Sequence, residues 1–358
     1  MSEEQINDAQ RVLVDLIRFA LAFIVVIGHG FGFFWGYFDG FFPRVFPHPQ
    51  SIAVIGFFYL SGYLIVGSVL KQKSRYSNAG LGNYLFNRVL RIYLTLIPSI
   101  VFVIIVDFLF KNYTTLNLDL VTNNTNNTVL IKNIFLIPSM PYGTMRPIWS
   151  LMYEWWIYIF FGGIFFFKKN IILASLFILA GFYYTVFLNA QGEAGHIWII
   201  WAVGGLCAYL QKYSIWNRVN PNIHHFLILF FLMTSAVGYF YTKDAVNLIS
   251  GILFALFLYV LCNYRGALLK YLMKIKNPIK KLAGLSFTLF LTHYTVLTYI
   301  KEYFELQGIK GLIFGTVLSI YIAYFIACFT EYRLVRIKEK VFSKLLIITT
   351  LIQVHYSK

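Results

Sequence analysis

The sequence predicts an all-α fold, a polytopic integral membrane protein with about ten transmembrane helices. Of its 358 residues, 59% are hydrophobic and only 12% are charged, whereas soluble domains carry about 25% charged residues. The mean hydropathy is +0.69. Long apolar runs recur along the chain, and a run of about 18 apolar residues is long enough to cross a bilayer as a helix.

Ten segments meet this description, joined mostly by short connections. They are residues 12–34, 51–70, 86–110, 147–167, 170–188, 195–211, 223–242, 246–263, 282–300 and 310–330. A helix satisfies its own backbone hydrogen bonds, so it is the structure expected for each of them in lipid. The first run lacks a small-residue cleavage site and is therefore interpreted as a span, not a signal peptide. We expect one transmembrane domain over residues 1–340 and a short cytoplasmic tail over 341–358.

The distribution of cations predicts the direction of insertion. If the N- and C-termini are both cytoplasmic, only seven of the 30 Lys and Arg residues fall in outer segments and the other 23 face the cytoplasm. This is the asymmetry that the positive-inside rule describes. The net charge of +16 then faces anionic membrane lipids or an anionic cytoplasmic ligand, and it does not indicate nucleic-acid binding.

Two further patterns predict no chemistry. The longest outer segment, 111–146, contains "TNNTNNT" and is expected to be the most mobile loop. The three cysteines lie in or beside apolar runs without the spacing of metal ligands, so we expect buried, reduced thiols and no metal. They are Cys207, Cys262 and Cys328.

The first span carries two residues that hydrocarbon penalises, Arg18 and His29, in "RFALAFIVVIGHG". An ionisable residue inside a span is a functional hypothesis by default. Eleven positions at 100° per residue make three turns plus about 20°, so both residues share one face, about 16 Å apart along the axis. Arg18 is expected in the inner leaflet and His29 in the outer one. The structural alternatives are snorkelling of Arg18 or its pairing with Asp15, and a hydrogen bond from His29 to a neighbouring helix.

The segment "IWSLMYEWWIYIFF" places Glu154 about seven residues into a span that enters from the outside. That depth resembles the depth of His29. A carboxylate and an imidazole at matched depth predict an acid–base pair in which Glu154 orients His29. The alternative is that Glu154 only accepts hydrogen bonds from nearby Tyr or Trp side chains.

The segment "NRVLRIY" places Arg88 and Arg91 on one face at the cytoplasmic mouth of the third span. Two guanidinium groups at this spacing suit phosphate binding by bidentate hydrogen bonds. Ordinary positive-inside flanking is the alternative.

Three later motifs contain polar residues within or beside spans. In "FFYLSGYLI", Ser61 and Gly62 favour close helix packing. "LSFTLFLTH" brings His293 near mid-membrane, and "FTEYR" places Glu331 at a cytoplasmic helix end.

Taken in order, these motifs resemble the acyltransferase family 3 membrane enzymes, the integral-membrane O-acyltransferases of bacterial surface polysaccharides. The resemblance includes "SGYLI", "NRVLRIY", "WSLMYE", "SFTLFLTH" and "TEYRLVR" and runs from about Val12 to Arg336. The chain departs from the family where Leu94 follows Tyr93 and where Tyr332 follows Glu331, since proline is frequent at both places.

The resemblance implies the donor, the acceptor and the site. Members are thought to take an acyl group, commonly acetyl, from cytoplasmic acyl-CoA. Arg18, Arg88 and Arg91 match donor-side positions and His29 matches the catalytic histidine. The supporting positions are Asp15, Ser61, Ser150, His293 and Glu331. The implied acceptor is a hydroxyl of a lipid-linked or surface saccharide, such as lipopolysaccharide O-antigen, capsule or exopolysaccharide, and the implied location is the bacterial cytoplasmic (inner) membrane.

The expected mechanism uses His29 as a general base on the acceptor hydroxyl, with Glu154 supporting the imidazolium. A covalent acyl-histidine is the variant. A transporter or flippase with Arg18, His29, Glu154 and His293 as a relay is the alternative function, although no internal repeat favours it. A non-catalytic scaffold would give these residues no task.

Overall fold

The computed structural model describes residues 3–35, 48–75, 80–113, 123–169, 171–187, 196–213, 219–242, 248–334 and 336–337. Over these residues the chain is helical and contains no strand, which confirms the predicted all-α class. The α-helices are α1 (Glu3–Trp35), α2 (Pro49–Arg75), α3 (Leu81–Tyr113), α5 (Asn127–Ile134), α6 (Ile148–Phe166), α7 (Ile171–Phe182), α8 (Ile197–Leu210), α9 (Pro221–Thr242), α10 (Leu248–Cys262), α11 (Leu268–Lys274), α12 (Lys276–Phe304) and α13 (Gly308–Phe329).

Each of the ten predicted apolar segments overlaps one of these helices. Six helices are long and apolar enough to cross a membrane, namely α1, α2, α3, α6, α9 and α13. Three are shorter apolar helices, α7, α8 and α10, and α12 carries lysines near both ends. The chain is therefore a multi-pass membrane protein, while the count of ten spans and the cytoplasmic location of the termini stay predictions. The predicted tail, 341–358, lies outside the described residues.

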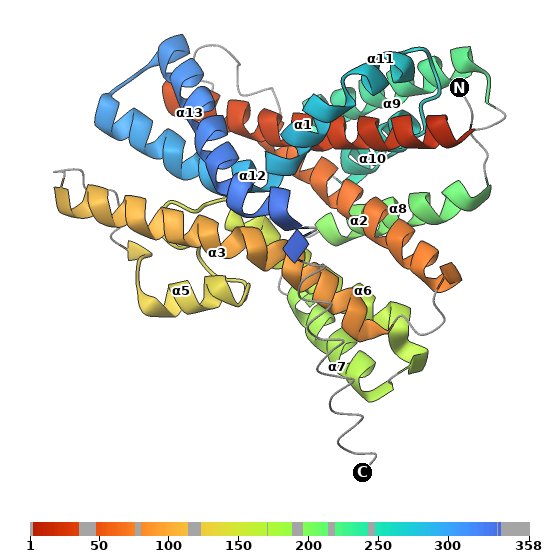
Figure 1. Cartoon of the computed structure of the whole chain (residues 1–358), viewed down its shortest axis with the longest axis horizontal. Coiled ribbons are helices and arrows are strands. Elements are labelled where there is room, and N and C mark those ends of the chain that lie inside the picture. The colour runs from red at the N-terminus through yellow and green to blue at the C-terminus, as the bar shows by residue number, and fades with distance from the viewer. Residues whose placement is uncertain are drawn as a thin grey trace.

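The directions of packed helices agree with segments that alternate across a membrane. In Figure 1, α1 lies beside α10 and α11 at one end and beside α12 and α13 at the other. Helices α1 and α12 are parallel, because contacts between them keep a nearly constant offset: Arg18 meets Ala283, and His29 meets His293. These helices contain the first and the ninth predicted segments. If successive spans alternate in direction, the first and the ninth cross the membrane in the same direction. Helices α12 and α13 are antiparallel, as consecutive segments must be.

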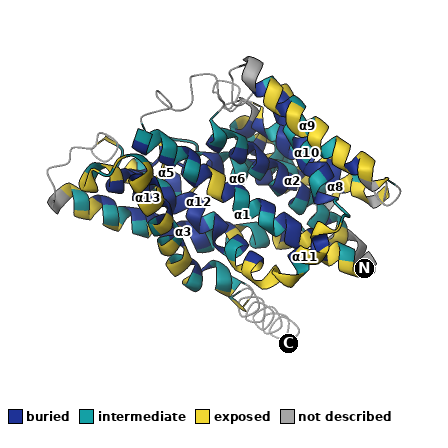
Figure 2. Ribbon diagram, turned by 90° about the horizontal axis from the view of Figure 1, so that it is seen from above, coloured by how far each residue is buried: buried dark blue, intermediate teal, exposed yellow. Residues whose placement is uncertain are grey.

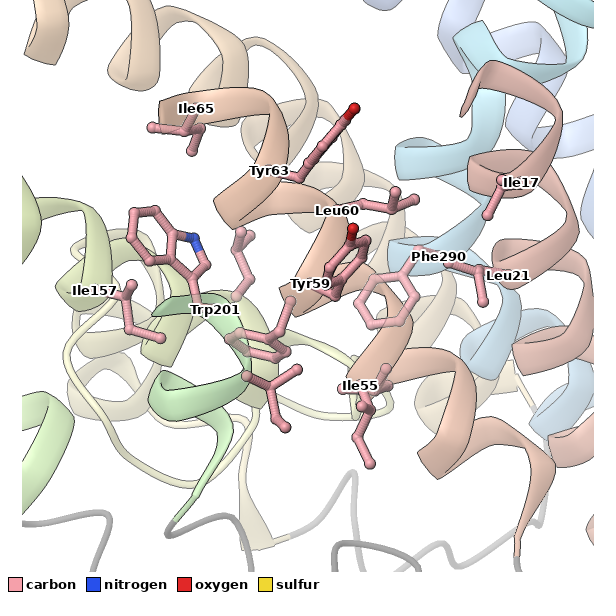
Figure 3. Close-up of a cluster of buried hydrophobic side chains, with 14 of the residues drawn as sticks. Ile17, Leu21, Ile55, Tyr59, Leu60, Tyr63, Ile65, Ile157, Trp201 and Phe290 are labelled. Carbon is pink, nitrogen blue, oxygen red and sulfur yellow. The ribbon is translucent and has the colours of Figure 1, made fainter. Parts of the chain in front are cut away.

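Helices α2 and α8 pack closely through small residues, as the Ser61-Gly62 step predicts. A Cβ on Gly62 would overlap the carbonyl oxygen of Trp201, and one on Gly204 would overlap that of Tyr59. Close backbone approach through small residues is the usual way in which membrane helices associate. Figure 3 shows Tyr59 and Leu60 of α2 between Trp201 on one side and Leu21 and Phe290 on the other.

The outer faces of the bundle are strongly apolar. Figure 2 shows buried residues in the middle and exposed residues on the outer sides, for example along α9. Exposed side chains there include Ile172 (79%), Leu179 (68%) and Tyr321 (66%). Apolar surface of this extent is stable against lipid and not against water, which agrees with a membrane-embedded bundle.

The segment expected to be the most mobile loop is instead built into the fold over residues 123–146, so that prediction is wrong there; residues 114–122 lie outside the described part. Asn126 caps α5 by accepting a hydrogen bond of 2.9 Å from the backbone N–H of Val129. The following stretch, 141–145, is buried. Gly143 adopts a φ of 51°, and a Cβ there would overlap the carboxylate of Asp107.

Asp107 anchors this buried stretch to α3 and α12. Its carboxylate accepts hydrogen bonds from the Thr144 backbone N–H (3.1 Å), the Thr144 hydroxyl (2.7 Å) and the Tyr299 hydroxyl (2.8 Å). The Thr144 hydroxyl also lies 3.0 Å from that of Thr295. A buried carboxylate needs this many donors to offset its lost hydration. The stretch before α6 is therefore fixed inside the bundle, and α6 begins among buried residues.

Candidate functional site

One cavity of about 240 Å³ gathers the charged residues that the sequence singled out, except Asp15. Its lining comes from α1, α2, α3, α6 and α12 and from the turn after α13. The charged residues among the lining are Arg18, Arg88, Arg91, Glu154 and Glu331, and Ser61 and Ser150 also contribute. The cavity thus carries three guanidinium groups against two carboxylates, which favours an anionic ligand.

Two of the arginines keep unused donors inside the protein. Arg18 donates from Nη2 to the carbonyl oxygen of Ala283 at 2.7 Å and lies 3.6 Å from Asp15. Its Nε is buried, and no described residue accepts a hydrogen bond from it; the Nε of Arg88 is in the same position. Arg88 also lies over the ring of Tyr84, with its Cζ 5.7 Å from the centroid. Buried N–H groups without acceptors are costly, so a bound anion would stabilise both side chains.

Glu331 joins the cavity to the end of α13. Its Oε2 accepts hydrogen bonds from the backbone N–H of Thr288 (3.2 Å) and from the Thr288 hydroxyl (2.6 Å). The sequence analysis placed Glu331 at a cytoplasmic helix end and among the supporting positions, and Thr288 was not singled out. Thr288 and Glu331 are 43 residues apart, and the sequence around Thr288 does not indicate a contact over that separation.

Glu154 ends a chain of hydrogen bonds that runs through three helices. The Tyr158 hydroxyl donates to its Oε1. Ser61 Oγ lies 2.9 Å from the Tyr158 oxygen, and Trp201 Nε1 donates to Ser61 Oγ at 3.1 Å. The carboxylate can only accept, so every donor in the chain points toward Glu154. Tyr158 was missed from the sequence, although its i+4 spacing from Glu154 places both on one helix face.

His29 pairs with His293 eleven residues along α1 from Arg18. Its Nδ1 lies 2.9 Å from Nε2 of His293, and the two ring centroids are 5.1 Å apart. The edge of Tyr294 meets the His29 ring at 5.3 Å between centroids. His293 Nδ1 lies 3.0 Å from the carbonyl oxygen of Leu289. Neither histidine lines the cavity.

Phe57 and Phe290 lie where the cavity approaches the histidines. Both line the cavity, and their ring centroids are 5.5 Å apart in an edge-to-face arrangement. The ring of Phe290 is also 6.3 Å from that of His293. Phe290 therefore connects the lining of the arginine-containing cavity to His293.

The predicted pairing of His29 with Glu154 is wrong in the structure. Glu154 is held by Tyr158 beside Arg88 and Arg91, and His29 is held by His293. The depth comparison failed because it assumed that α1 and α6 end at one level. The buried stretch 141–145 lets α6 begin inside the bundle, which carries Glu154 toward the level of the arginines.

No group of three His, Cys, Asp or Glu residues that could hold a metal ion occurs among the described residues. The three cysteines are free; Cys207 and Cys262 are buried and Cys328 is half-buried.

Comparison with known proteins gives one match. A family model described as an acyltransferase domain matches residues 12–329 of the chain, which include every charged residue of the cavity except Glu331. No curated protein and no solved structure matches.

Proposed function

Because the chain belongs to the acyltransferase family 3 membrane enzymes, whose model covers residues 12–329, we propose that it transfers an acyl group, in the simplest case acetyl, from cytoplasmic acyl-CoA to a saccharide hydroxyl. The acceptor in this proposal is a lipid-linked or surface saccharide such as O-antigen, capsule or exopolysaccharide. The location is the inner membrane of a bacterium.

The observation that carries the donor assignment is the meeting of Arg18, Arg88 and Arg91 in one cavity, two of them with buried Nε atoms that no described residue accepts from. Coenzyme A carries phosphates at one end and the thioester at the other. Guanidinium groups bind phosphate through bidentate, charge-assisted hydrogen bonds.

The distance between Arg18 and His29 suits the same donor. Eleven helical residues separate them by about 16 Å along α1. A coenzyme held by its phosphates at the arginines can extend its flexible arm past Phe57 and Phe290 toward His29. The thioester would then lie beside the imidazole, where an acceptor hydroxyl can reach it from the outer side.

The chemical step needs a base. His29 removes the proton from the acceptor hydroxyl, the oxygen attacks the thioester carbonyl, and the carbon–sulfur bond breaks. The proton then passes to the sulfur, which gives an ester and free coenzyme thiol. In the covalent variant the imidazole itself accepts the acyl group first.

The test is acyl transfer by the purified full-length chain in lipid nanodiscs. With [¹⁴C]acetyl-CoA, we expect thioester loss that depends on His29 and is absent from correctly folded His29→Ala and His29→Gln variants. Mass spectrometry of the cell-surface glycan, with and without the protein, identifies the acetylated sugar. A wild-type protein that leaves acetyl-CoA intact while moving a saccharide across the bilayer would instead establish the flippase.

A further inference from the structure

We propose that His293 is a positioning residue that fixes His29 in its Nδ1–H tautomer, so that Nε2 of His29 is the nitrogen that takes the proton from the acceptor. The inference rests on the proposed function and specifies its base. The family match assigns no role to His293, and the resemblance gives it only as a supporting position without a stated task.

The argument starts at the carbonyl oxygen of Leu289, which can only accept a hydrogen bond. His293 Nδ1 lies 3.0 Å from it, so this nitrogen carries the proton. His293 is fully buried, with an exposed fraction of 0%, and no carboxylate contacts it among the described residues. An unpaired imidazolium there would be costly. The ring is therefore neutral, and its Nε2 has a lone pair.

That lone pair determines the state of His29. His29 Nδ1 lies 2.9 Å from His293 Nε2, and a hydrogen bond at this distance needs one donor and one acceptor. Since His293 Nε2 accepts, His29 Nδ1 must donate. A neutral His29 then has its proton on Nδ1 and its lone pair on Nε2.

The surrounding helices hold this geometry in place. Helices α1 and α12 pack in parallel. Arg18, eleven residues before His29 on α1, donates to the carbonyl oxygen of Ala283, ten residues before His293 on α12. The edge of Tyr294 confines the His29 ring from a second side. Rotation of the His29 ring would break its contact with His293.

The proton movements follow from this arrangement. The acceptor O–H proton moves to His29 Nε2 as the oxygen forms its bond to the acyl carbon. His29 is then an imidazolium, and its Nδ1–H stays bonded to the lone pair of His293, which stabilises the charge. When the carbon–sulfur bond breaks, the sulfur takes the electron pair and the Nε2 proton, and His29 returns to its starting tautomer.

The first experiment compares His293→Leu with His293→Gln in acetyl transfer from acetyl-CoA. Leucine removes the acceptor and should lower kcat on the order of 100-fold, while KM for acetyl-CoA stays within about two-fold because the arginine-lined cavity is untouched. Glutamine offers an amide oxygen to His29 Nδ1 and should restore at least a tenth of the wild-type kcat. His225→Leu, on an exposed histidine of α9, is the control and should match wild type.

Equal kcat values for the leucine variant and wild type would overturn the proposal, as would equal losses in both variants when both are folded. Retained binding of coenzyme A, measured by calorimetry, shows that a variant is folded. If wild type itself does not consume acetyl-CoA, the proposed function fails, and the tautomer is then decided by the second experiment.

The second experiment reads the tautomer directly. In protein labelled with ¹⁵N-histidine, which has 7 histidines, the nitrogen shifts distinguish a protonated ring nitrogen from a bare one. We expect His29, assigned from the His29→Gln spectrum, to show a protonated Nδ1 and a bare Nε2 in wild type and a mixture in His293→Leu. A protonated Nε2 in wild type would refute the assignment, whatever reaction the protein catalyses.

Discussion

Arg18 donates a hydrogen bond of 2.7 Å to the carbonyl oxygen of Ala283, at almost the same α1–α12 offset that joins His29 to His293. One pair of parallel helices therefore presents an arginine toward the cavity and two imidazoles farther along. The spacing between the two ends, about 16 Å, is a property of the helices and not of flexible loops. Groups held on rigid helices keep the geometry that catalysis requires.

Arg88 should bind the phosphate end of the donor. Arg88→Ala removes a guanidinium whose Nε is buried and should raise KM for acetyl-CoA about ten-fold or more, since a charge-assisted hydrogen bond contributes about 1.5–3 kcal/mol. Acetyl-pantetheine keeps the reactive arm but lacks the nucleotide phosphates, so its KM should not change. Arg11→Ala, on an exposed arginine paired with Asp8, is the control. An equal rise in KM for both thioesters would contradict a phosphate contact.

Glu154 should act on the donor side and not on His29. Glu154→Gln keeps an oxygen for the Tyr158 hydroxyl but removes one negative charge from the cavity. Coenzyme A should then bind about two- to five-fold more tightly at low salt, because the phosphates meet less repulsion. Calorimetry measures the affinity, with Glu302→Gln at the other end of the bundle as the control. A loss of kcat as large as that of His29→Gln would instead support the original pairing.

Gly62 should be essential for the packing of α2 on α8. Gly62→Ala places a methyl group against the Trp201 carbonyl and should destabilise the fold by about 1–3 kcal/mol through overpacking. Gly67→Ala on the same helix is the matched control, because its Cβ would lie 3.9 Å from that of Ala208, an ordinary contact. Thermal unfolding in detergent compares the two. The order of stability should be Gly67→Ala at or above wild type, with Gly62→Ala below both.

Asp107 should stabilise the stretch that precedes α6. Asp107→Ala leaves the Thr144 N–H and the Tyr299 hydroxyl without their acceptor, and each buried unsatisfied group costs about 1–3 kcal/mol. Asparagine can accept from the N–H and donate to the hydroxyls, so Asp107→Asn should recover much of the loss. Limited proteolysis within residues 136–147 and the unfolding midpoint report the change. Lys111→Ala, one turn away and exposed, should be neutral in both measurements.

The sequence predicted the helices well because lipid leaves the backbone few choices. Every apolar segment overlaps a helix, and Ser61 and Gly62 predicted close helix packing in α2, although not that α8 is the partner. The missed elements, α5 and α11, have eight and seven residues, and both are too short to show the apolar run of a span. The meeting of Arg18, Arg88 and Arg91 was predicted as a donor side, and the structure places the three in one cavity.

The partners of His29, the proposed base, could not be predicted in the same way. His293 was noted, but its distance in sequence from His29 gave no sign of contact. The depth of Glu154 was estimated from the helix end, and a buried segment such as 141–145 contradicts the assumption that helices end at the membrane surface. Contacts of this kind depend on tertiary packing, which apolar periodicity does not encode.

The pairing of α1 with α12 also governs when the protein becomes functional during its synthesis. His29 and His293 are 264 residues apart, so the ribosome has made more than four-fifths of the chain before the second imidazole exists. Until then, Arg18 and His29 of α1 lack their α12 contacts. Ionisable side chains without partners in lipid have a high free energy. Contacts between residues so far apart in sequence form slowly. Until α12 is made, other helices or insertion factors must bind these two side chains.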